Sequence, residues 1–157
     1  MGSFVAAKIE PTAKEDIVNG LTQALAETAV ETLKAQNFHW NVTGMSFGPL
    51  HELFQKIYED HFEAQDTLAE RIKAFDAHAE GRHSVYLERS AVKEHDGHAD
   101  ARGMIEALLK DQETLSATLS SLAQVAEEHG DWATNDLATA RIETHDKFAW
   151  FLRAHLK

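Results

Sequence analysis

The 157-residue sequence has no cysteine and only two prolines, Pro11 and Pro49. Without cysteine the chain can form no disulfide, no thiolate metal site and no cysteine nucleophile, which agrees with the cytoplasmic location that we expect. Because proline interrupts helices, its scarcity leaves room for long ones. Apolar runs stay shorter than the roughly 18 residues of a membrane span, and the segment from Met1 to Lys8 does not resemble a signal peptide.

Positive charge is also scarce, since 15 lysines and arginines stand against 26 aspartates and glutamates, for a formal net charge of −11. This balance argues against a general nucleic-acid surface and favours attraction of cations. A hydrophobic content of 43% is ordinary for a globular protein. The length then suits one domain with a sizeable core, so we expect a single domain over 1–157, of which 1–11 form a flexible tail.

Apolar residues recur at helical spacing in four segments and predict helices over about 13–40, 49–79, 99–129 and 134–156. Thr12 and Glu15 fit a capping box at the first start, and Pro49 fits the first position of the second helix. The second helix is expected to end near Gly81, and the connection over about 81–99 to hold a short helix. The side chains expected in the core of the first and last helices are Ile17, Leu21, Leu25, Ala29, Leu33, Leu137, Ala140, Phe148 and Phe151.

Those four long segments, with one long crossover between the second and the third, predict an all-α, ferritin-like four-helix bundle. No stretch of useful length alternates as a strand would. The fold class by itself does not fix a function, so the chemistry must come from particular side chains.

Two histidines and two carboxylates are the strongest metal-ligand candidates. Asp66 and Glu70 are four residues apart, so they share one face of the second predicted helix. His51 precedes Asp66 by 15 residues, which is roughly 22 Å of helix, whereas metal–ligand bonds are about 2 Å. One chain therefore cannot hold one ion with both, although a turn can bring His39 to His51. Two antiparallel copies could align the two pairs; alternatively, these are four unconnected surface residues.

Two familiar metal signatures are incomplete in this sequence. The run His51-Glu52-Leu53-Phe54-Gln55 places glutamine where the zinc-protease helix needs its second histidine. The Glu-x-x-His spacing of bundle di-iron centres occurs at Glu80 and His83, but Gly81 interrupts it. We therefore expect neither a protease-type zinc site nor a di-iron centre inside one bundle.

Four stretches together resemble the Dps family, the DNA-binding proteins from starved cells or mini-ferritins. They are Asn37-Phe38-His39-Trp40-Asn41-Val42-Thr43-Gly44, Leu50-His51-Glu52, Asp66-Thr67-Leu68-Ala69-Glu70-Arg71-Ile72 and Asp146-Lys147-Phe148-Ala149-Trp150-Phe151. The resemblance implies a homododecamer around a hollow core that oxidises ferrous iron, mainly with hydrogen peroxide, stores the ferric product and protects against oxidative stress. It also implies an iron site in which His39 and His51 of one subunit meet Asp66 and Glu70 of another.

Some positions depart from the family pattern or extend it. Gln55 stands where relatives often have an aspartate one turn after the second histidine, which leaves the number of irons per site open. Trp40 could act as an electron donor beside His39, or pack at the dimer seam. Asp131 and Asp136 match the acidic residues that line threefold pores in relatives, although acidic residues at a helix start are also favoured by the helix dipole.

The sequence leaves open a second metal site and a different function. The crossover histidines His78, His83, His95 and His98 could hold a second metal, or simply be solvated. A nucleoid-packing protein with weak or no ferroxidase activity is the alternative to the iron cage. Phosphate binding needs clustered cations, and the first 16 residues carry two lysines against three acidic residues. We therefore expect DNA binding to be weak or absent.

Overall fold

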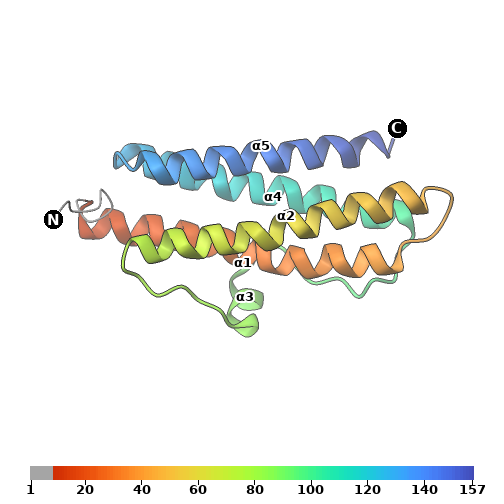
Figure 1. Ribbon diagram of the computed structural model, residues 1–157, viewed down its shortest axis with the longest axis horizontal. Helices are drawn as coiled ribbons and strands as arrows, with labels where there is room; N and C mark the ends of the chain where they lie inside the picture. Colours follow the sequence, from red (N-terminus) through yellow and green to blue (C-terminus); the bar gives the residue numbers. More distant parts are fainter. Residues whose placement is uncertain (1–8) are drawn as a thin grey trace.

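The computed structural model describes residues 9–157, and this part of the chain is helical without a strand. The helices are α1 (Pro11–Asn41), α2 (Phe47–Ala74), α3 (His83–Arg89), α4 (Ala101–Glu128) and α5 (Trp132–Ala154). Four of them lie side by side along the long axis, and the short α3 stands off to one side (Figure 1). The predicted ferritin-like four-helix bundle, with a short helix in its crossover, is confirmed.

The order of the helices explains the long connection. α1 and α2 form an antiparallel pair, and the crossover then carries the chain back along the bundle, so α4 runs parallel to α2 and antiparallel to α5 (Figure 1). α1 packs against α2, α4 and α3, while α4 packs against α5. None of the helices in residues 9–157 combines the length and the apolar character needed to cross a membrane.

Three predicted helix ends are wrong. α2 ends at Ala74 rather than near residue 79, because Asp76 adopts a φ of 57° and takes the chain out of the helix. α1 begins at Pro11 with Glu10 as its N-cap and no capping side-chain hydrogen bond, so the capping box is absent. α2 begins at Phe47, two residues before Pro49. The expected tail falls mainly on residues 1–8, which lie outside the described residues.

Two expected core positions are also wrong. Leu33 is 53% exposed, because a strict four-residue spacing turns about 40° past a full helical turn at each step and so leaves the core face. Ala140 is exposed as well, because the face of α5 that meets the core passes through Ala138, which is buried, and not through Ala140. The expected core positions of the other two long helices mix steps of three and four, and all of them are buried. They are Leu50, Leu53, Phe54, Ile57, Ala64, Leu68, Ile72 and Phe75 in and just after α2, and Met104, Leu108, Leu115, Leu119, Leu122 and Ala126 in α4.

The apolar core is divided into two clusters, one towards each end of the bundle. One is built around Phe38 and Phe54 near the α1–α2 turn, and the other around Leu21 and Phe75 at the opposite end. Between them every long helix contributes a buried polar side chain: Glu31, His61, Gln112 and His145. The middle of the bundle is therefore polar, and its chemistry differs from that of both ends.

Candidate functional site

The turn between α1 and α2 brings His39 and His51 into direct contact. Their rings stack with centroids 3.6 Å apart and an angle of 15° between the planes. The Nδ1 of His39 donates to the backbone oxygen of His51 (2.6 Å), and the Nδ1 of His51 donates to the backbone oxygen of His39 (2.7 Å). Because both Nδ1 atoms are engaged, both Nε2 atoms remain available to an ion, as in metal sites whose second ring nitrogen is held by a hydrogen bond.

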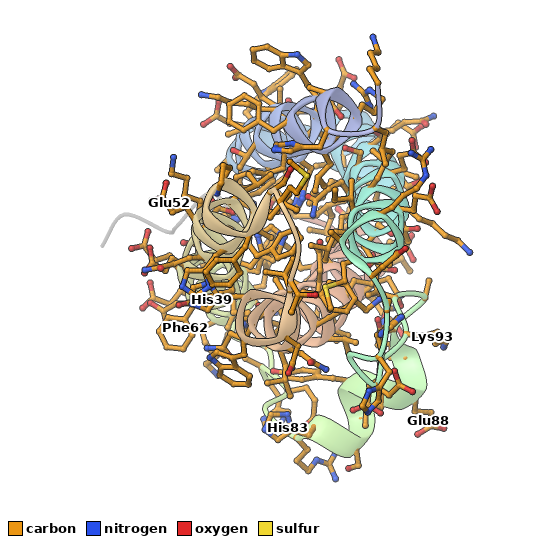
Figure 2. The ribbon with its side chains drawn as sticks, turned by 90° about the vertical axis from the view of Figure 1, so that its right-hand side faces the viewer. His39, Glu52, Phe62, His83, Glu88 and Lys93 are labelled. Carbon is orange, nitrogen blue, oxygen red and sulfur yellow. The ribbon has the colours of Figure 1, made fainter. Side chains whose placement is uncertain are left out.

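Aromatic neighbours hold the two imidazoles in place. The ring of Tyr58 meets His39 edge-on at 5.3 Å, and Phe47 stacks on His51 at 5.1 Å. His39 is 8% exposed and lies at the outer edge of the bundle, on the same side as Phe62 (Figure 2). The histidine pair is thus ordered by its own chain while facing the surface, where a second subunit could complete it.

The two carboxylates do not reach this pair within one chain. Asp66 and Glu70 are exposed on the second half of α2. Since α2 is continuous from Phe47 to Ala74, Asp66 lies roughly 22 Å along the helix from His51. The fold therefore brings together the histidines, and separately the carboxylates, but keeps the two pairs apart.

Two residues near the histidine pair in the sequence, Gln55 and Trp40, were also singled out in the sequence. Gln55, one turn after His51, donates its Nε2 to Glu59 Oε1 at 2.8 Å. Trp40, the residue after His39, is 63% exposed, so its indole lies on the surface. An uncharged amide in this place is a weaker ligand for ferric iron than a carboxylate.

Asp131 and Asp136 occupy different environments. Asp131 is the N-cap of α5, where its Oδ1 accepts from the backbone N–H of Thr134 (3.1 Å) and from Nη2 of Arg71 (2.8 Å). It is 1% exposed, which is the setting of a helix cap. Asp136 is exposed on the second turn of α5, which leaves its carboxylate free to face a channel in an assembly.

Among the crossover histidines, His95 packs its ring edge-on against Phe38 at 4.9 Å, and its Nδ1 accepts from the backbone N–H of Gly97 at 3.0 Å. These contacts give His95 a structural role in the crossover. Within residues 9–157 the one group of three metal-binding side chains gathered at a point is elsewhere, at Glu31, His61 and His145. A metal site in the crossover stays a prediction.

The sequence reasoning missed this buried group, which belongs to a closed ring of six side chains that we call the central ring. Its members are Glu31, Asp60, His61, Gln112, Arg141 and His145. His61 donates to Glu31 Oε2 (2.8 Å) and to Asp60 Oδ2 (3.0 Å). A signal was present but was not used: His61 lies between Ile57 and Ala64 on the apolar face of α2.

Four more pairs of side chains close the central ring. Arg141 donates to both oxygens of Asp60 (3.0 and 2.7 Å) and to Nε2 of His145 (3.2 Å). His145 donates its Nδ1–H to Gln112 Oε1 (2.7 Å), and the amide of Gln112 donates to Glu31 Oε1. One assignment of protons satisfies every contact, with His61 charged and His145 neutral.

The surroundings favour that assignment. Burial alone would lower the pKa of His61, but the charge of Glu31 and the hydrogen bonds to Asp60 and Glu31 outweigh it and raise the pKa. Burial, together with the positive charges of His61 and Arg141, lowers the pKa of His145 well below its usual value. Burial would raise the pKa of Asp60, but its bonds to His61 and Arg141 lower it far below the ordinary range. The positive and negative charges of the ring therefore balance.

Comparison with known proteins places the chain in a family. The ferritin-like domain model matches residues 18–157. DNA protection during starvation protein 2 of Bacillus anthracis is 34% identical over 142 residues, which cover 90% of this chain and 97% of that one. The crystal structure of a Dps protein from Bacillus brevis superposes with a TM-score of 0.91 at 31% identity, covering 95% of this chain and 100% of that one.

A second solved structure agrees. It is the DPS protein from Vibrio cholerae O1, described as a member of a broad superfamily of ferritin-like diiron-carboxylate proteins, with a TM-score of 0.91, 32% identity, and coverage of 95% of this chain and 94% of that one. The family model and the relatives each span most of the chain, and both agree with the resemblance seen in the sequence. The chain belongs to the Dps family of ferritin-like proteins.

Proposed function

We propose that this protein is a ferroxidase and iron-storage cage, which oxidises ferrous iron with hydrogen peroxide, or oxygen, at sites shared by two subunits. His39 and His51 of one subunit and Asp66 and Glu70 of its twofold partner bind the iron, and twelve subunits enclose the ferric product. In this reaction iron is the substrate, and removing it together with peroxide protects the cell against oxidative damage.

One observation carries the proposal. The two stacked histidines keep both Nε2 atoms free, while the carboxylates that could complete their ligand set lie on the same continuous helix, roughly 22 Å away. A twofold contact is self-complementary, so an antiparallel partner supplies at each end what the other chain lacks. The Vibrio cholerae protein is described as a ferritin-like diiron-carboxylate protein, which supports iron as the metal that binds here.

The ligand types suit this chemistry. Imidazole and carboxylate bind ferrous iron and leave coordination positions open for an oxidant. Each ferrous ion gives up one electron, and a peroxide molecule accepts two electrons and two protons as its O–O bond breaks, so that two waters form. Asp66 and Glu70 contribute negative charge that favours the ferric product, and Glu70 anchors the ion. The uncharged Gln55 makes a second iron position at the site weaker.

Two accessory roles belong to the same proposal. Trp40, exposed beside His39, is placed to donate an electron when a site holds a single iron. Asp136, exposed near the start of α5, contributes to an acidic channel that draws cations inward. Asp131 contributes to the same channel through its charge, although its carboxylate is mainly engaged as the cap of α5.

The experiment is an anaerobic titration of the assembled protein with ferrous iron, followed by separate additions of hydrogen peroxide and oxygen. We expect rapid oxidation with peroxide, slower oxidation with oxygen, and loss of the rapid phase in His51→Ala. His129→Ala, which removes an exposed histidine at the end of α4, is the matched control and should keep the wild-type rate. Equal rates in wild type and His51→Ala would contradict the proposed site.

DNA packing is the second candidate function, because the Bacillus anthracis relative carries the name DNA protection during starvation protein 2. The formal charge of −11 per chain opposes it, since binding to phosphates requires clustered lysines and arginines. A packing protein would also have no need of the stacked histidine pair. We therefore place this function second.

A further inference from the structure

Three ligand atoms meet in the middle of the bundle, inside a single subunit. Glu31 from α1, His61 from α2 and His145 from α5 each offer one atom, and these atoms all lie within 4.8 Å of one another. All three residues are fully buried. Burying a carboxylate and two imidazoles is costly unless each has a partner, and the central ring gives every one of the three a hydrogen-bond partner.

A second, independent feature is the way in which the neighbours orient the three residues. The Nδ1 of His61 donates to Asp60 Oδ2 (3.0 Å), and the Nδ1 of His145 donates to Gln112 Oε1 (2.7 Å). Proteins hold metal-binding imidazoles in this way, through the ring nitrogen that does not face the ion. Gln112 also donates to Glu31 Oε1, while the other carboxylate oxygen, Oε2, meets Nε2 of His61.

We propose that Glu31, His61 and His145 form a second metal site, one in each subunit, for a divalent first-row transition ion such as Fe²⁺, Zn²⁺ or Co²⁺. Two imidazoles and one carboxylate suit these ions and are poor ligands for Mg²⁺ or Ca²⁺. The set differs from the Glu-x-x-His pairs of bundle di-iron centres. With one carboxylate it has too little negative charge for two ions, so the site holds one.

The central ring can accept an ion at little structural cost. The proton on His61 Nε2 is donated to Glu31 Oε2 over 2.8 Å, and the ion takes the place of that proton. Arg141 Nη2 must leave Nε2 of His145, which at 3.2 Å is the longest contact of the ring. Arg141 keeps both of its shorter bonds to Asp60, so the rest of the ring stays closed.

This site is separate from the shared site proposed above. His61 lies ten residues beyond His51 on α2, which is roughly 15 Å along the helix, and all the ligands come from one chain. The inference does not depend on iron oxidation or on the twofold partner. It can therefore be tested in a protein whose shared site has been removed.

The test uses the assembled double variant His51→Ala/Asp66→Ala, titrated without oxygen with cobalt chloride. We expect about one equivalent of cobalt per subunit with the strong visible absorption of a low-coordinate ion. Adding His145→Gln should abolish this band, whereas adding His129→Ala should leave it unchanged. Gln112→Leu keeps all three ligands but removes their orienting partner, and should weaken binding by about 10- to 100-fold.

Folding of each variant is checked by circular dichroism, and assembly by light scattering. If His145→Gln does not assemble, a crystal of the double variant soaked in cobalt decides the matter through the anomalous signal at the cobalt edge. A peak between His61 and His145 supports the site. Cobalt binding that is absent, that survives His145→Gln, or that gives no peak at this position would overturn the inference, whatever the outcome for the shared site.

Discussion

Mixing two inactive variants should restore iron oxidation if the site is shared between subunits. His51→Ala removes a ligand from the histidine end of α2, and Asp66→Ala removes one from the carboxylate end, roughly 22 Å away. When a chain of each kind faces the other across a twofold axis, one end of the interface carries both lesions and the other end is intact. Random mixing gives such pairs about half the time, so about a quarter of the wild-type sites return.

The assay is peroxide-driven oxidation of ferrous iron by the two variants, refolded separately and together. We expect the mixture to reach about a quarter of the wild-type rate and each parent to stay inactive. The matched control mixes His51→Ala with His39→Ala, because both lesions then lie on the histidine side and every interface remains defective at both ends. If native mass spectrometry shows mixed assemblies and activity is still missing, the reasoning from helix rise is refuted.

Three further predictions concern DNA, a tight turn and a buried acid. At physiological salt and neutral pH, micromolar protein should not shift duplex DNA in a gel, and a shift that disappears with rising salt would reveal a basic surface formed on assembly. Gly97→Ala should lower the thermal midpoint more than Gly44→Ala: both glycines have positive φ (85° and 107°), but a Cβ at Gly97 would lie 2.2 Å from Asn37 Oδ1 and one at Gly44 would meet nothing within 4 Å. The backbone strain costs roughly 1–3 kcal/mol at either glycine. Equal decreases in thermal midpoint would therefore show that the turn at Gly97 shifts enough to relieve the contact with Asn37. Burial, then the charge of Glu31, raises the pKa of Asp111 to about 7. Its protonated form is therefore favoured by folding, and this contribution to stability is full below about pH 4 and lost as the pH rises through about 7. The difference in thermal midpoint between about pH 5 and pH 8 should shrink in Asp111→Asn, and an unchanged difference would assign the pH dependence to other groups.

Much of the architecture could be read from local patterns. The buried faces of α2 and α4 were predicted correctly because their apolar residues mix steps of three and four, which track the helical repeat. The faces of α1 and α5 were partly wrong where a four-residue step was followed to Leu33, or where Ala140 was chosen in place of Ala138. The end of α2 depended on one residue, Asp76, whose positive φ is uncommon even for an aspartate and could not be predicted from the sequence.

The separation of the two ligand pairs was determined by the sequence alone. Helical rise is fixed by backbone geometry, so His51 and Asp66 had to lie far apart on α2 whatever the rest of the chain did. The closeness of His39 and His51 could be expected from the turn between their helices. The stacking of the two rings, and the hydrogen bond from each Nδ1 to the backbone of the other histidine, depend on the conformation of the turn and could be seen only in the structure.

Only the tertiary structure decided what lies at the middle of the bundle. Glu31 and Gln112 are 81 residues apart in the chain, and Gln112 and His145 are 33 apart, yet they share hydrogen bonds. Taken one at a time, these side chains were a glutamate, a glutamine and a histidine on separate helices. Which faces of four helices meet is set by packing over the whole bundle, and that packing turned scattered polar residues into one closed ring.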